Sequence, residues 1–160
     1  MVRGELQSMK SCFFIGHRET NITILPELIQ EVERHITEYG VYDFAVGRYG
    51  NFDRLAAIAV RDAKKRHQQV TLTLLHPYAF DIPLLKSEVY DAVFYPPEME
   101  RVPKRLAIVR ANQYMIEHST HLIAYVSHPS GGSRMVLEAA LARQKRGLMR
   151  VTNLAGWYPG

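Results

Sequence analysis

Short apolar runs alternate with longer amphipathic stretches along most of the 160-residue chain. Several of the runs stop at a glycine or a proline, which is typical of strands that are buried on both faces of a sheet. The runs that we expect to form strands cover residues 11–15, 42–46, 70–75, 92–95, 121–126 and 147–151.

Between these runs, apolar residues recur every three or four positions, which predicts amphipathic helices. The helices are expected at 24–39, 52–67, 80–88, 102–118 and 135–144, the third of them short. Strands that alternate with helices at this spacing predict parallel strands joined by right-handed crossovers. The predicted fold class is therefore α/β, a Rossmann-like parallel sheet of five to six strands with helices on both faces.

The length suits a single domain, and a second core would be hard to fit. We expect an N-terminal extension over 1–10, the Rossmann-like domain over 11–152 and a C-terminal tail over 153–160. The one cysteine, Cys12, lies in an apolar run and is expected to be buried and unreactive. No stretch approaches the ~18 apolar residues of a membrane span, and the first residues lack the apolar core of a signal peptide, so we expect a cytoplasmic protein with no membrane partner.

The net charge of +4 and the pI of about 9.3 suit anionic ligands in general, from a phosphate to a nucleic acid. Much of the positive charge falls in two clusters, 61–66 and 143–146, that close amphipathic stretches. Cations complement the helix dipole there, so we interpret both clusters as solvated helix ends. Basic residues interleaved with aromatic ones, which single-strand binders use, are not found, so a nucleic-acid partner has no support beyond the charge.

Ligands of open parallel sheets bind outside the carboxyl ends of the strands, so the residues that follow each strand matter most. Gly16, His17 and Arg18 follow the first strand. The glycine allows a sharp turn, and the two side chains suit a phosphate or carboxylate, although the same residues also suit a solvent-exposed polar turn.

A second glycine-containing loop follows the second strand and leads into a helix. Its backbone N–H groups and the positive end of the helix dipole predict an anion site. The acidic residue in the first helical turn is expected either to cap the helix or to accept a hydrogen bond from a ribose hydroxyl. The candidate residues in this loop are Gly47, Arg48, Gly50, Asn51 and Asp53.

The third loop follows the fifth strand and again opens a helix. Its glycines allow a ligand to approach the backbone closely, and its last serine is expected to cap the helix or to donate to a phosphate oxygen. The loop residues are Ser130, Gly131, Gly132 and Ser133. Glu138, further along the helix, is expected to point back to the crevice or to pair with Arg134. The seven histidines show no metal-binding spacing, so no metal site is predicted.

Together these segments resemble the SLOG superfamily, Rossmann-like proteins that include DprA/Smf and the Lonely Guy (LOG) phosphoribohydrolases, and the chain is most similar to the YpsA-like branch. The segments that carry the resemblance are 14–18, 46–56, 110–119 and 130–133. The resemblance implies a nucleotide or ADP-ribose-like ligand, no required cofactor, and a homodimer or larger homo-oligomer. It also implies that Arg110 and Asn112 face the ligand. The helices expected at 104–118 and 135–144 carry apolar residues beyond one core stripe, so we expect the contact between copies to be built through them.

The LOG branch cleaves the N-glycosidic bond of a nucleoside monophosphate with a loop similar to 130–138. By that resemblance Glu138 would stabilise the ribose cation and Arg110 would hold the phosphate. The paired glycines and the glutamate match the LOG loop, whereas Arg134 and Met135 stand where it has a third glycine and a threonine. Three functions stay open: a nucleotide-binding module or sensor, a LOG-like phosphoribohydrolase, and a DprA-like nucleic-acid binder.

Overall fold

The structure, a computed structural model, describes residues 9–78, 89–128 and 131–156. Six strands and four α-helices, with three short 3-10 turns, follow one another along the described residues. Their bounds are β1 (Ser11–Gly16), η1 (Ile22–Ile24), α2 (Leu25–Thr37), β2 (Asp43–Val46), α3 (Asn51–Lys64), β3 (Thr71–Leu75), β4 (Ala92–Phe94), η2 (Met99–Arg101), η3 (Lys104–Leu106), α5 (Ala107–His118), β5 (His121–Tyr125), α6 (Gly132–Lys145) and β6 (Arg150–Asn153).

All six strands are parallel and lie in the order β4-β3-β2-β1-β5-β6. The chain builds outward from β1 to β4, returns to place β5 on the free side of β1, and ends with β6. The strand order therefore reverses between β1 and β5, and such a switch point is where open α/β sheets form a ligand crevice. The predicted Rossmann-like α/β fold is confirmed.

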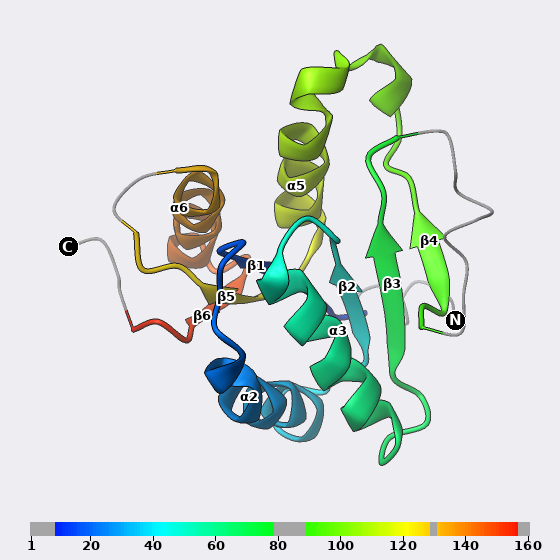
Figure 1. Cartoon of the computed structure of the whole chain (residues 1–160), viewed down its shortest axis with the longest axis vertical. Helices are drawn as coiled ribbons and strands as arrows, with labels where there is room; N and C mark the ends of the chain where they lie inside the picture. The colour runs from blue at the N-terminus through cyan, green and yellow to red at the C-terminus, as the bar shows by residue number, and fades with distance from the viewer. Residues whose placement is uncertain (1–8, 79–88, 129–130, 157–160) are drawn as a thin grey trace.

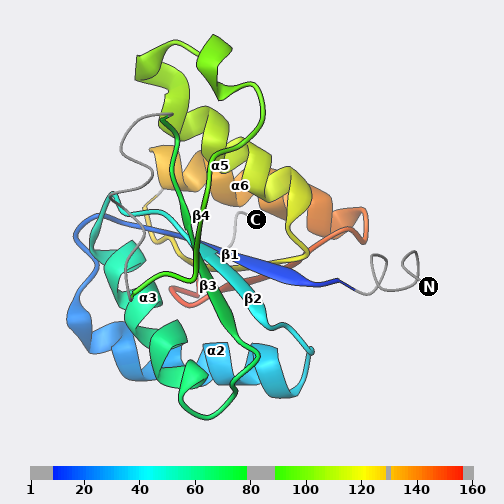
Figure 2. The same ribbon diagram turned by 90° about the vertical axis from the view of Figure 1, so that its right-hand side faces the viewer.

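Helices cover both faces of the sheet, α2 and α3 on one side and α5 and α6 on the other (Figures 1 and 2). Alternate residues of β1 serve the two sides. Cys12 and Phe14 belong to the core under α2 and α3, whereas Phe13 and Ile15 belong to the core under α5 and α6. A strand buried on both faces needs a continuous apolar run, which is why this segment shows no polar alternation.

Three elements, β6, α5 and α6, begin three or more residues away from the predicted position. The sixth strand is Arg150–Asn153 rather than 147–151, because Gly147 adopts a positive φ of 74° just after α6 and the chain needs Leu148 and Met149 to reach the sheet. The helix expected from 102 starts at Ala107, preceded by the short turn η3 that follows Pro103.

Helix α6 starts earlier than predicted, at Gly132 instead of 135, so the glycine pair forms the start of the helix itself. The short helix expected at 80–88 and most of the predicted N-terminal extension lie outside the described residues. Within the described ranges, no helix combines the length and apolarity that crossing a membrane requires.

Candidate functional site

The loops that follow β1, β2 and β5 meet at a crevice of about 890 Å³, which α5 and α6 extend on one side of the sheet. This volume is within the range of small-molecule sites. Ten of the residues expected from the sequence line it: Gly16, His17, Arg18, Gly47, Gly50, Asp53, Asn112, Gly131, Gly132 and Ser133. The parallel sheet thus brings the three glycine loops to one edge, as predicted.

The loop after β1 is fastened to the start of α3. The carbonyl of Arg18 accepts a hydrogen bond at 2.9 Å from the backbone N–H of Asn51, whose side-chain amide donates to the carbonyl of Thr20. A Cβ on Gly50 would lie 2.7 Å from the Cα of Arg18, so the two loops touch backbone to backbone. Asn51 is absent from the described lining, and its amide holds the two loops together.

Asp53 turns its carboxylate back over the start of α3. Its Oδ2 accepts a hydrogen bond at 3.0 Å from the backbone N–H of Tyr49. Burial raises the pKa of Asp53 to about 6, against the lowering effect of the Tyr49 hydrogen bond. Of the two roles expected for this residue, the structure shows a contact at the helix start, and the side chain also lines the crevice.

The start of α6 is open by contrast. No side chain caps it within the described residues, and Gly131, at its N-cap, has a φ of 110° that favours glycine. Among the described atoms, a Cβ on Gly131 or Gly132 would meet nothing within 4 Å beyond its chain neighbours. Ser133 donates its hydroxyl to the carbonyl of Gly16 at 3.1 Å, which ties α6 to the end of β1. Ser130 lies outside the described residues.

Three further candidates lie outside the described lining of the crevice. Arg48 is exposed in the loop after β2, and Arg110 lies in a separate hollow with Arg101 and Tyr114. Glu138 pairs with Arg134, with its Oε2 at 3.0 Å from the guanidinium Nε, which is the second of the two roles expected for it. The structure therefore does not bring Arg110 and Glu138 to the glycine pair that opens α6.

Sequence reasoning missed several residues of the crevice, among them Tyr49, Gln113, His128, Met135, Arg143 and Arg146. Arg143 and Arg146 were interpreted as a solvated helix end, but both line the crevice, and Arg143 is partly buried. Positions 135, 139, 143 and 146 repeat at helical spacing on one side of α6, and this spacing was the available clue.

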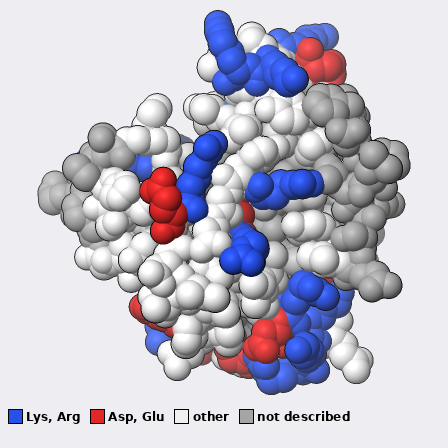
Figure 3. Space-filling model, viewed as in Figure 1, with Lys and Arg blue, Asp and Glu red and all other residues white. Residues whose placement is uncertain are grey.

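Basic side chains also lie in the middle of the face shown in Figure 3, which favours an anionic ligand.

No group of three or more His, Cys, Asp or Glu side chains suited to a metal ion occurs in the parts of the chain that the structure describes. The sequence matches none of the known protein-family models, and no curated protein matches it. The function is therefore inferred from the geometry of the crevice.

Proposed function

We propose that the chain binds a nucleotide or a nucleotide derivative, such as an ADP-ribose-like molecule, in the crevice at the switch point, and that it acts as a binding module or sensor. The observation that carries the proposal is the start of α6, which no described side chain caps and where a Cβ on Gly131 or Gly132 would meet no described atom within 4 Å outside its chain neighbours and the helix backbone. The positive end of a helix dipole and exposed N–H groups together bind phosphate. The resemblance of the glycine segments to the SLOG superfamily supports the same ligand class.

A thermal-shift screen tests this proposal. The panel is AMP, ADP-ribose, NAD and cyclic nucleotides, with adenosine as the control that lacks a phosphate. A ligand at 100 times its dissociation constant adds about 2.7 kcal/mol to the free energy of unfolding. For a domain of this size we expect Tm to rise by about 5–10 °C for at least one phosphorylated compound, and by less for adenosine. A Tm that no member of the panel changes would refute the proposal.

The second candidate is cleavage of the N-glycosidic bond of a nucleoside monophosphate. The observation that favours it is Asp53, a carboxyl in the crevice lining whose pKa of about 6 suits proton transfer near neutral pH. Glu138, by contrast, is engaged with Arg134. We expect AMP to bind without release of adenine over hours, as followed by chromatography. Release that Asp53→Asn abolishes would establish the enzyme instead.

Assembly into a homodimer is part of the proposal, because apolar side chains are exposed on the α5 and α6 side. Val109 is 47% exposed and Met135 66% exposed. We expect light scattering at about 20–50 μM to give the mass of a dimer, and Met135→Glu to give the mass of a monomer, since a buried charge without a partner disfavours an interface. The control is Ile22→Glu, since Ile22 is 59% exposed on η1, beside α2. A monomeric wild-type protein would reject the dimer.

A further inference from the structure

Two histidines from different loops stack on each other in the crevice. His17 follows β1, His128 follows β5, and both line the crevice. Their ring centroids are 3.9 Å apart and their planes are inclined by 21°. The stack therefore bridges the switch point from one side to the other.

His17 is held in place by its neighbours. Its Nε2 accepts a hydrogen bond at 2.9 Å from the backbone N–H of Ser127, and Tyr125 meets its ring edge-on, with centroids 6.2 Å apart. A nitrogen that accepts from a backbone N–H carries no proton, so the ring is neutral with its hydrogen on Nδ1. Burial, and then the proximity of His128, lower the pKa of His17, while Glu19 acts in the opposite sense. Near neutral pH the inner ring of the stack is therefore an uncharged aromatic surface.

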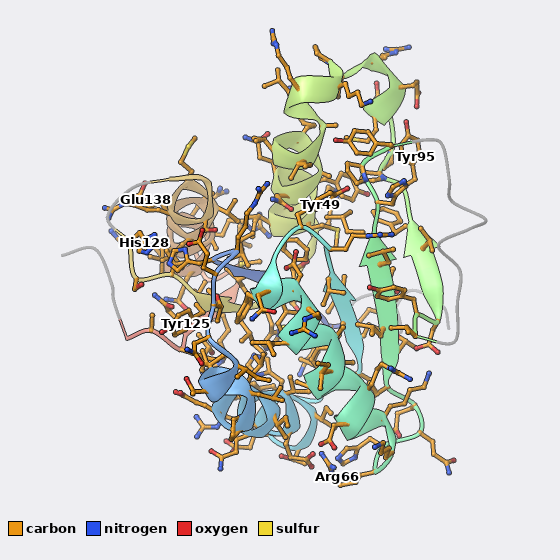
Figure 4. All side chains as sticks on the ribbon, in the orientation of Figure 1. Tyr49, Arg66, Tyr95, Tyr125, His128 and Glu138 are labelled. Carbon is orange, nitrogen blue, oxygen red and sulfur yellow. The ribbon has the colours of Figure 1, made fainter. Side chains whose placement is uncertain are left out.

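The outer ring, that of His128, is exposed, and His17 is the only ring that stacks on it among the described residues. Figure 4 shows His128 beside α6, and Gly131 follows it by three residues. Three residues of extended chain reach at most ~10 Å, so the ring cannot lie far from the open start of α6. His128, Gly131 and Gly132 all line the same crevice, so one ligand in it can contact both the ring and the start of α6.

We infer that the exposed face of His128 is the stacking position for a planar heteroaromatic ring carried on a phosphorylated sugar. The inference rests on the proposed function and adds to it the position of the base. His17 acts as a positioning residue, because it fixes the orientation of the ring on which the base stacks. The phosphate is held separately by the N–H groups at the start of α6, so base and phosphate depend on different residues.

The test compares AMP with ribose 5-phosphate, which has the same phosphate and sugar but no base. Calorimetry measures both ligands on the wild-type protein, His128→Ala and His128→Tyr. Loss of a base–aromatic stack weakens binding by about tenfold, so we expect His128→Ala to weaken AMP by about that factor and to leave ribose 5-phosphate unchanged. His128→Tyr, which keeps an aromatic face, should retain the affinity for AMP.

The chain contains a matched control. His118 stacks on Tyr114 in nearly the same geometry, with centroids 3.9 Å apart and planes inclined by 16°, but it is not part of the crevice lining. His118→Ala should leave both affinities unchanged. Equal weakening of the two ligands by His128→Ala would show that the imidazole contacts the phosphate, and unchanged AMP binding would show that it contacts neither part. Either result overturns the inference while the proposed function stands, whereas a wild-type protein that binds neither of these two ligands nor any other member of the nucleotide panel overturns both.

Discussion

Replacing Asp53 with asparagine should raise the free energy of unfolding at pH 7 by up to about 3 kcal/mol. Burial raises the pKa of this carboxyl to about 6 in the folded protein, whereas an unfolded aspartate titrates near 3.9. The folded state thus holds the proton more tightly than the unfolded state does. Well below pH 4 both states are protonated and the carboxyl imposes no penalty. Between the two pKa values the unfolded state is ionised while the folded state keeps its proton, and the free energy of unfolding falls by about 1.4 kcal/mol for each pH unit. Above pH 6 the buried carboxyl is ionised as well, and the loss is complete.

Urea unfolding at pH 4 and pH 7 measures this effect. The amide oxygen of asparagine still accepts from Tyr49, so the variant keeps the hydrogen bond and loses the buried charge. Its advantage over the wild-type protein should be fully present at pH 7 and fall to about 0.5 kcal/mol at pH 4. Asp62→Asn is the control on the same helix, since Asp62 pairs with Arg66 at 3.0 Å near the surface and its loss should lower stability slightly or not at all. An Asp53→Asn variant that gains the same stability at both pH values, or loses stability at pH 7, contradicts the account.

Gly132→Leu should abolish most nucleotide binding, a loss of a hundredfold or more, while Tm changes by only a few degrees. A phosphate at the start of α6 would accept charge-assisted hydrogen bonds, each of which contributes about 1.5–3 kcal/mol. A leucine side chain there would stand in the space that the phosphate needs. Apart from chain neighbours and the helix's own backbone, the described part of the protein has no atom within 4 Å of a Cβ at that position, so the side chain starts into open space and we expect the fold to tolerate it.

Gly50→Ala is the control, because we expect it to change Tm rather than to block the start of α6. Its Cβ would lie 2.7 Å from the Cα of Arg18, so the substitution should lower Tm by forcing two loops apart. Calorimetry with AMP and thermal unfolding of both variants separate the two kinds of glycine, one required for packing and one kept open for a ligand. If Gly132→Leu binds the nucleotide with wild-type affinity, the phosphate does not bind at the start of α6.

The fold was predictable from the sequence because the interior strands are buried on both faces. An apolar run as short as 11–15 suits a buried strand better than a helix, and β1 begins at Ser11 as predicted. The sixth strand was placed too early because Leu148 and Met149 are apolar, yet they connect α6 to the sheet rather than pair within it. The strand order was beyond sequence reasoning, since it depends on which side of β1 the chain returns to after β4.

The site residues that belong to the glycine loops were predicted correctly, because the backbone alone determines where these loops lie. Residues on helices were predicted less well, because the rotation of the helix about its axis determines which side chains face the crevice. The glycine loops meet because the carboxyl ends of parallel strands lie at the same edge of the sheet. On α5, Asn112 lines the crevice, and a residue two positions away on a helix points about 200° around the axis. Arg110 therefore faces a different hollow. His128 was missed because a histidine in a turn has no distinguishing feature until His17 is seen to stack on it.

The position of Cys12 has a practical consequence for labelling. It is the only cysteine in the chain, its side chain is fully buried in β1, and burial raises the pKa of its thiol well above the usual value. Thiol reagents attack the thiolate of accessible cysteines, so the native protein should resist them. A cysteine introduced at an exposed crevice position outside the proposed dimer contact, such as Arg146, would then be the single reactive thiol. A fluorophore attached there would report ligand binding in the crevice, and Cys12 would not have to be replaced.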